Sequence, residues 1–154
     1  MGKYTIAALR VVIALSLLGS LVVQLMIIPA IWRDLETVEM SPRIAFVTIA
    51  VLGVVTLQVS ALCIWRLLTM VRRGSVFSPG AFRYVDVIAA SIAVAALLLF
   101  VLAALLAPGG TAPGVVGLIG GFGLVAAGVV LLVLVMRSLL TQATQLRSEL
   151  DEVV

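Results

Sequence analysis

Residues 66–86 have the sequence Arg66-Leu-Leu-Thr-Met-Val-Arg-Arg-Gly-Ser-Val-Phe-Ser-Pro-Gly-Ala-Phe-Arg-Tyr-Val-Asp86 and separate two long apolar runs. Four of the ten Lys and Arg residues of the chain lie in this segment, which we name the middle loop. Lys and Arg concentrate in the short loops that stay on the cytoplasmic side of a membrane. The middle loop therefore indicates the side of a bilayer on which the two flanking runs meet.

The composition is more apolar than that of a soluble domain. Of the 154 residues, 64% are hydrophobic and 11% are charged, whereas soluble domains are about 45–50% apolar and about 25% charged. A very apolar soluble helical bundle is the less favoured alternative. The net charge of +3 does not indicate nucleic-acid binding, because the basic residues flank apolar runs and form no basic face with interleaved aromatic residues.

Four apolar runs, each without a charged residue, are long enough to cross a membrane: residues 11–32, 44–65, 87–107 and 115–136. A helix needs roughly 20 residues to cross about 30 Å of hydrocarbon. The connections are short, so neighbouring helices should run antiparallel. We predict an all-α integral membrane four-helix bundle that forms a single membrane domain over residues 1–154.

The basic residues predict the orientation. Two of the ten, Arg33 and Arg43, fall on one side of this threading, together with Asp34, Glu36 and Glu39. The other eight fall on the opposite side: Lys3, Arg10, Arg66, Arg72, Arg73, Arg83, Arg137 and Arg147. The positive-inside rule then places both termini in the cytoplasm. Arg outnumbers Lys nine to one, as in a high-GC bacterial genome, so we expect a multi-pass protein of the bacterial plasma membrane.

The usual chemistry-bearing residues are scarce. The chain has no His, and its one cysteine, Cys63, lies inside an apolar run, so neither a disulfide framework nor a Cys-based metal site can form. An intramembrane aspartyl protease needs two Asp within its spans, and a small multidrug exporter normally carries a membrane-embedded carboxylate. We therefore expect a protein that is not an enzyme, with no catalytic residue, cofactor or metal.

Two glutamines stand out among the mild polar residues of the spans, where polar groups are the default place to look for function. Counted along straight helices, Gln24 and Gln58 differ in depth by about 9 Å, so we predict no direct pairing. Gln58 matches the level of Ser16 and Ser20, and a bond to one of these is expected. The glutamines either hold helices together or line a substrate path.

The fourth apolar run is rich in glycine, and Gly117-Leu-Ile-Gly-Gly121 contains a GxxxG pattern. Small residues allow helix backbones to approach closely in a membrane. The glycine face packs either within the bundle or against a second copy of the chain, as a homodimer through Gly117 and Gly121.

Asp86 is the one acidic residue beside the inner ends of the spans before the tail. It follows Arg83 by three residues, and side chains at that spacing meet on a helix. We predict a structural ion pair with Arg83, and the other arginines of the middle loop are alternative partners.

The tail, residues 137–154, continues an apolar pattern. Met136, Leu139, Ala143, Leu146, Leu150 and Val153 are spaced 3, 4, 3, 4 and 3 with mostly polar residues between them. This spacing predicts that helix four extends into the cytoplasm by up to about 25 Å. The stripe either packs on the middle loop or provides a docking strip for a second chain or a soluble partner.

Within the middle loop, Arg72 and Arg73 suit the anionic headgroups of the inner leaflet. Gly74 should end the second helix, and Ser78-Pro79 should begin the third, because Ser caps helices and Pro is tolerated in the first turn. Val76 and Phe77 can dip into the interface.

Arg73-Gly-Ser-Val-Phe-Ser78, followed by a short helical run with Arg83 and then a span, resembles a bacterial family of four-span membrane proteins catalogued as domain of unknown function twenty-nine seventy-five. Family members usually carry an Asn after this turn and a Leu-Arg pair, where this chain has Pro79-Gly80 and Phe82-Arg83. The resemblance implies no known activity. Members are often encoded beside a small helix-turn-helix regulator, which implies a regulatory or immunity role.

We therefore expect a non-enzymatic protein that acts by contact with a cytoplasmic regulator protein. The partner or lipid contacts should come from the middle loop and the tail: Arg72, Arg73, Phe77, Arg83, Leu139, Leu146 and Leu150. The alternatives are a small-molecule or ion transporter or channel that uses Gln24 and Gln58, and a structural accessory subunit of a membrane complex.

Overall fold

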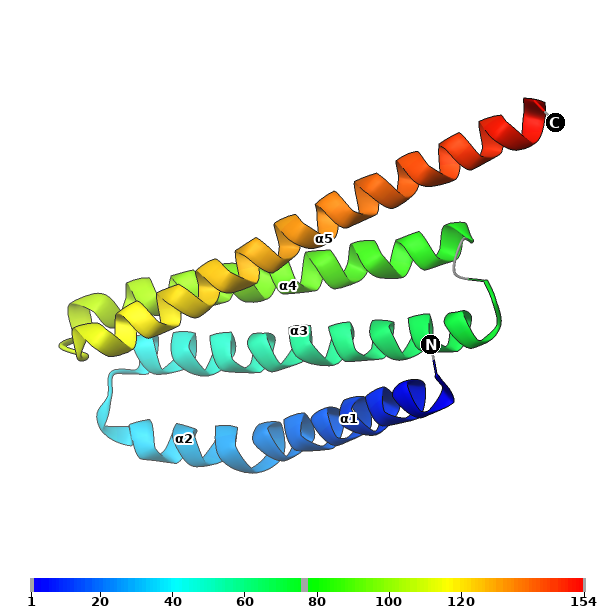
Figure 1. The fold of residues 1–154 in the computed structure, drawn as a ribbon. Coiled ribbons are helices and arrows are strands. Elements are labelled where there is room, and N and C mark those ends of the chain that lie inside the picture. Colours follow the sequence, from blue (N-terminus) through cyan, green and yellow to red (C-terminus); the bar gives the residue numbers. More distant parts are fainter. Residues whose placement is uncertain (1, 76–77, 154) are drawn as a thin grey trace.

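The structure, a computed structural model, describes residues 2–75 and 78–153 as four long helical rods (Figure 1). The first rod comprises α1 (Lys3–Val22), a π-helical turn (Val23–Ile27), α2 (Ile28–Asp34) and a 3₁₀ turn (Leu35–Thr37). The others are α3 (Met40–Arg72), α4 (Pro79–Leu106) with a 3₁₀ turn (Ala107–Gly109), and α5 (Pro113–Val153). All four rods are long and apolar enough to span a membrane, which confirms the predicted all-α fold with four apolar helices.

The first rod is the irregular one. Pro29 lacks a backbone N–H and its ring clashes with the carbonyl four residues earlier, so a regular α-helical ladder cannot continue through it. The π-helical turn lies just before Pro29, and the N–H of Ile28 donates to the carbonyl of Val23, five residues back. The break expected at this proline is therefore a π turn, a feature that often accompanies functional sites.

The rods pack antiparallel and in chain order. Figure 1 shows α1 and α2 beside α3, α3 beside α4, and α5 crossing α4 obliquely, and the extensive contacts join these neighbours. On α4 the buried residues include a stripe of small side chains at near-heptad spacing: Ala81, Ala89, Ala96 and Ala103. Small side chains let the helices on either side approach the α4 backbone, where dispersion contacts replace the hydrophobic drive that lipid does not supply.

Large apolar side chains cover the outer surface. Leu15, Leu97 and Leu131 are each more than 60% exposed, and in the part of the chain that the structure describes no large side chain is fully buried. A soluble monomer rarely exposes so much contiguous apolar surface. The chain is therefore a multi-span membrane protein, and the alternative of a soluble apolar bundle is set aside.

The two ends of the molecule differ. The end that holds the N-terminus, the connection from α3 to α4 and the projecting C-terminal part of α5 is named the α3–α4 end (Figure 1). The opposite end holds the connections from α2 to α3 and from α4 to α5 and is named the α4–α5 end.

Candidate functional site

The connection at the α3–α4 end is built as predicted on both sides of its centre. Gly74 adopts φ 71° at the end of α3, and Ser75 N–H donates to Met70 O at 3.1 Å, which is the bonding of a Schellman cap. Ser78 precedes Pro79 at the start of α4, and its hydroxyl donates to Ser75 O at 2.8 Å. The predicted helix end at Gly74 and helix start at Ser78-Pro79 are confirmed, but the Ser78 hydroxyl does not cap α4 as expected.

The predicted contact arginines lie at this end. Arg72, Arg73 and Arg83 are exposed, so their guanidinium groups are free to meet lipid headgroups or a partner protein. Val76 and Phe77, which were predicted to dip into the membrane interface, lie outside the described residues.

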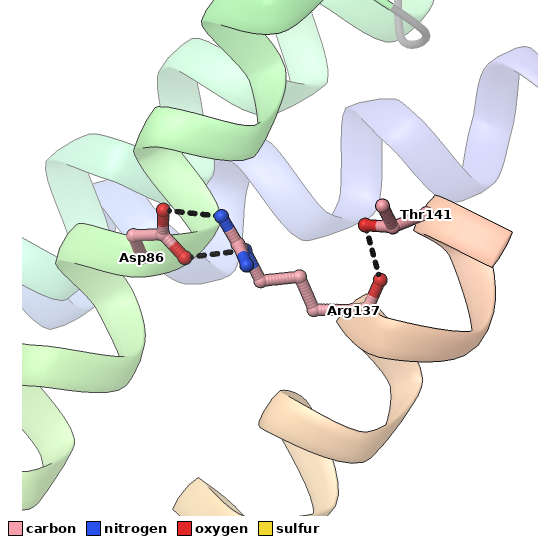
Figure 2. Close-up of polar contacts among 3 residues, drawn as sticks. All are labelled: Asp86, Arg137 and Thr141. Carbon is pink, nitrogen blue, oxygen red and sulfur yellow. Dashed lines mark hydrogen bonds and ion pairs between the residues drawn. The ribbon is translucent and has the colours of Figure 1, made fainter. Parts of the chain in front are cut away.

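Asp86 pairs with Arg137 on α5. The prediction that it pairs with Arg83 or another arginine of the middle loop is therefore wrong. Arg137 Nη2 donates to Asp86 Oδ2 at 2.8 Å, and Nε lies 2.5 Å from Oδ1 (Figure 2). Thr141 lies one turn after Arg137 on α5, and its hydroxyl donates to the Arg137 carbonyl at 3.0 Å. The i,i+3 spacing of Arg83 was misleading because a planar guanidinium on a neighbouring helix can engage both carboxylate oxygens.

Gln24 and Gln58 form a direct hydrogen bond, so the prediction that they do not pair is wrong. Gln58 Nε2 donates to Gln24 Oε1 at 2.9 Å and to Ser20 Oγ at 3.1 Å, and the second contact confirms the expected bond to a serine. Ser16 instead donates to the carbonyl of Val12 at 2.8 Å. The amide of Gln58 thus bridges two residues of the first rod.

The direction of helical side chains explains the error. Every Cα–Cβ bond tilts toward the N-terminus of its own helix. The two rods are antiparallel, so Gln24 leans toward the α3–α4 end while Gln58 leans away from it, and the two long side chains converge across the predicted difference in depth. Gln24 also lies in the π-helical turn, where a count along a straight α-helix does not hold.

Two Arg–Trp contacts join the first rod to α3, and sequence analysis missed both. Near the α4–α5 end, Arg43 is buried, its Cζ lies 4.0 Å from the centroid of the Trp32 ring, and Nη2 donates to the Trp32 carbonyl. Near the α3–α4 end, Arg10 lies 5.5 Å from the Trp65 ring centroid, and Nη2 donates to Thr69 Oγ1 at 3.1 Å. Each of these Arg and Trp residues lies at the end of a span. Because the first two spans are antiparallel, these positions could have predicted that each Arg meets a Trp.

A groove of ≈ 450 Å³ lies near the middle of the molecule between α3, α4 and α5. It is mostly apolar, with hydroxyls from Thr56, Ser60 and Ser91, and Ser60 Oγ donates to Ser91 Oγ at 3.2 Å. Neither Gln24 nor Gln58 lines this groove. The glutamine cluster between the first rod and α3 is therefore separate from the hydroxyl-lined groove.

The glycines of α5 face two ways. Gly123 is buried against α4: a Cβ at this position would lie 3.3 Å from Leu99 Cβ, 3.3 Å from Phe100 Cε1 and 3.4 Å from the Ala96 carbonyl oxygen. A Cβ at Gly117 or Gly121 would have nothing within 4 Å. Close packing within the chain thus uses Gly123, and the GxxxG pair stays on an open surface.

The tail is a continuous extension of α5, as predicted, and projects from the α3–α4 end (Figure 1). Its apolar residues, named the tail stripe, are Leu139, Ala143, Leu146, Leu150 and Val153. Leu139 borders an apolar groove of ≈ 650 Å³ with Phe82 and Val85 of α4. Leu146 and Leu150, further along the tail, are 61% and 66% exposed.

Within residues 2–75 and 78–153, no group of three or more His, Cys, Asp or Glu side chains could hold a metal ion. Cys63 is a buried free thiol on α3. The side-chain bonds of Arg10, Gln58 and Arg137 join helices to one another, and exposed basic residues gather at the α3–α4 end.

A family model described as "Protein of unknown function (DUF2975)" matches residues 3–154. The chain belongs to this family. The match covers nearly the whole chain and confirms the resemblance carried by the middle loop. No curated protein and no solved structure gives a significant match to this DUF2975 protein.

Proposed function

We propose that this DUF2975 protein is a non-enzymatic regulatory or immunity-type membrane protein that binds a cytoplasmic partner through its α3–α4 end. The observation that carries the proposal is the tail stripe, which runs along an exposed helix beyond the last span. An amphipathic helix with an uncovered apolar stripe gains stability when it packs against another helix. In a non-enzymatic protein, such a helix would bind another protein.

The charge distribution supports a cytoplasmic position for this end. Eight of the ten Lys and Arg residues belong to the α3–α4 end or to its tail, and the positive-inside rule favours keeping such segments in the cytoplasm. The proposed location is the bacterial plasma membrane with both termini inside.

The chemistry of the tail favours an amphipathic helix with a basic flank as the partner. Glu149, Asp151 and Glu152 lie beside the distal part of the tail stripe and would attract basic residues next to the apolar face of a partner helix. The helix-turn-helix regulator implied by the family resemblance is the first candidate for this partner.

Site-specific photocrosslinking in cells tests the proposal. A photoreactive amino acid replaces Leu146 or Leu150 on the stripe, and matched control variants carry it at Gln145 or Ser148 on the polar positions of the same tail. We expect an adduct of one defined protein from the stripe positions, absent from the controls and lost when the remaining stripe leucine is changed to Asp.

Two outcomes contradict the proposal. Equal adducts from stripe and control positions would indicate random collisions along an exposed helix. Adducts formed only with a second copy of the chain would replace the cytoplasmic partner with self-association. The same variants without irradiation provide the background in both cases.

A second candidate function, a small-molecule or ion transporter, is favoured by the mostly apolar groove of ≈ 450 Å³ between α3, α4 and α5, which falls in the size range of about 300–1,000 Å³ typical of ligand pockets. Ion flux into liposomes that contain the purified protein tests it. Transport requires flux above that of protein-free liposomes, and this flux should fall when Ala126→Phe fills the groove.

A further inference from the structure

Two adjoining hollows lie between α1 and the last turns of α3 at the α3–α4 end. The larger, of ≈ 680 Å³, is lined by Lys3, Ile6, Ala7, Arg10, Val71 and Arg72. The smaller, of ≈ 420 Å³, shares Arg10 and Arg72 with it and adds Trp65, Thr69 and Arg73. Together they form one basic hollow that holds four cationic side chains from two helices.

The positive charge of the basic hollow is not balanced by nearby carboxylates. In the described part of the chain the one ion pair joins Asp86 to Arg137, so the four cations of the hollow have no carboxylate within ion-pair distance. The other acidic residues lie on the first rod and its connection to α3 near the α4–α5 end, or in the tail: Asp34, Glu36, Glu39, Glu149, Asp151 and Glu152. An anion in the hollow would meet attraction from several sides.

Arg10 is held in place at the boundary between the two hollows. Its Nη2 donates to Thr69 Oγ1 at 3.1 Å, and its guanidinium carbon lies 5.5 Å from the Trp65 ring centroid. Because a guanidinium carries five N–H donors, these contacts leave others for a ligand. An arginine fixed in this way loses little side-chain entropy when it binds a phosphate group.

Part of the wall of the larger hollow is apolar, with Ile6 and Ala7 on α1 and Val71 on α3 beside its basic side chains. Its position is also that of a membrane surface, because Arg10 immediately precedes the first apolar span and Trp65 ends the second. A ligand that fits has a phosphate head and an apolar body. Basic pockets between membrane helices are the places where anionic lipid headgroups bind.

We propose that the basic hollow between α1 and α3 binds the phosphate headgroup of an anionic phospholipid, with the acyl chains lying against the apolar surface of these helices. The site requires neither the tail nor a partner protein, so it goes beyond the proposed function and stands independently of it.

The test measures binding of phosphatidylglycerol to the full-length protein in detergent by native mass spectrometry, with phosphatidylcholine of the same acyl chains as the neutral comparison. The site variant is Lys3→Gln with Arg72→Gln. The matched control is Arg66→Gln with Arg147→Gln, which removes the same charge from the α3–α4 end and its tail but from outside the hollow. Both variants leave the contacts of Arg10 in place.

We expect wild type and the control variant to bind phosphatidylglycerol in preference to phosphatidylcholine. The site variant should bind it about 30-fold more weakly, the factor that follows from losing about 1 kcal/mol for each basic residue. Equal weakening in both variants, or equal binding of the two lipids by wild type, would overturn the proposal. Glycerol phosphate without acyl chains should not compete; effective competition would replace the lipid with a soluble phosphate compound.

Discussion

Arg43 on α3 and Trp32 on α2 form the closest cation–aromatic contact described, with the guanidinium carbon 4.0 Å from the ring centroid. Arg10 and Trp65 repeat the contact near the other end of the same pair of rods, with the roles of the two rods exchanged. The Gln24–Gln58 bond lies between them. The first rod, which shares less contact with the rest of the chain than α4 or α5 does, is thus fixed to α3 at three levels.

The Arg43 contact should be a main determinant of stability at the α4–α5 end. Arg43→Gln removes a desolvated cation–aromatic contact and a donor to the Trp32 carbonyl, so the free energy of unfolding should fall by about 2 kcal/mol. Reversible unfolding in mixed micelles, followed by circular dichroism, measures this change.

Arg33→Gln is the matched control for Arg43→Gln. Arg33 lies beside Trp32 but is exposed, and exposed substitutions usually change stability by less than about 0.5 kcal/mol. Equal losses in the two variants would show that the position of Arg43 on Trp32 contributes nothing beyond its charge.

The Gln24–Gln58 bond should behave as a link between helices. Gln58→Leu should lower the stability by about 0.6 kcal/mol and at most about 2 kcal/mol, the range found for polar bonds between membrane helices. Gln24→Leu combined with Gln58→Leu should cost less than the sum of the two single changes, because either one already breaks the bond. A double-mutant cycle in mixed micelles measures this coupling, and a coupling of zero would contradict the link.

Sequence patterns predicted the parts of this fold that depend on local composition. The four apolar spans, the helix end at Gly74 and the helix start at Ser78-Pro79 each follow from residues adjacent in the chain, and all are found. The middle loop also carried the family resemblance, which the DUF2975 match confirms.

Contacts between helices were not predictable in the same way. The partner of Asp86 depends on how α5 crosses α4, and the Gln24–Gln58 bond depends on the tilt of two side chains and on a π turn. Local spacing contains neither quantity. The basic hollow likewise exists because antiparallel packing brings Lys3 and Arg10 beside Arg72, which are far apart in the sequence.

The Asp86–Arg137 pair should contribute modestly and should depend on salt. The two side chains are 46% and 38% exposed, and exposed ion pairs are worth about 0.2–1 kcal/mol. Either Asp86→Asn or Arg137→Gln should lose that amount, and the charge exchange Asp86→Arg with Arg137→Asp should recover part of it. Unfolding measured at low and high salt checks this, because high salt screens exposed charges; a loss of the same size at both would contradict an electrostatic origin.

The two glycine positions of α5 should respond in opposite ways to the same substitution. Gly123→Leu forces a side chain into Leu99 and Phe100, which lie 3.3 Å from a Cβ, and should cost about 1–3 kcal/mol through overpacking. Gly121→Leu meets open space and should leave the monomer as stable as wild type. Any self-association through Gly117 and Gly121 should then be lost only in Gly121→Leu, as measured by light scattering in detergent.

The expected orientation can be tested with single cysteines in a Cys63→Ala background. Ser75→Cys and Gln145→Cys report on the α3–α4 end, and Thr37→Cys and Thr111→Cys report on the α4–α5 end. With both termini in the cytoplasm, a membrane-impermeant maleimide should label only the second pair in intact spheroplasts and the first pair only after permeabilisation. The reverse pattern would contradict the orientation.

The excess of basic residues at the α3–α4 end provides a stricter test of this orientation. Eight Lys and Arg residues on one side oppose two on the other, and neutralising the four arginines of the middle loop leaves 8 − 4 = 4 against two. Because the bias of basic residues sets the orientation, the neutralised chain should insert in both orientations. Each of the four cysteines should then be labelled in part in intact spheroplasts and fully only after permeabilisation. If all labelling stays on the original side, the middle loop does not set the topology, and the basic residues that remain outside it determine the orientation.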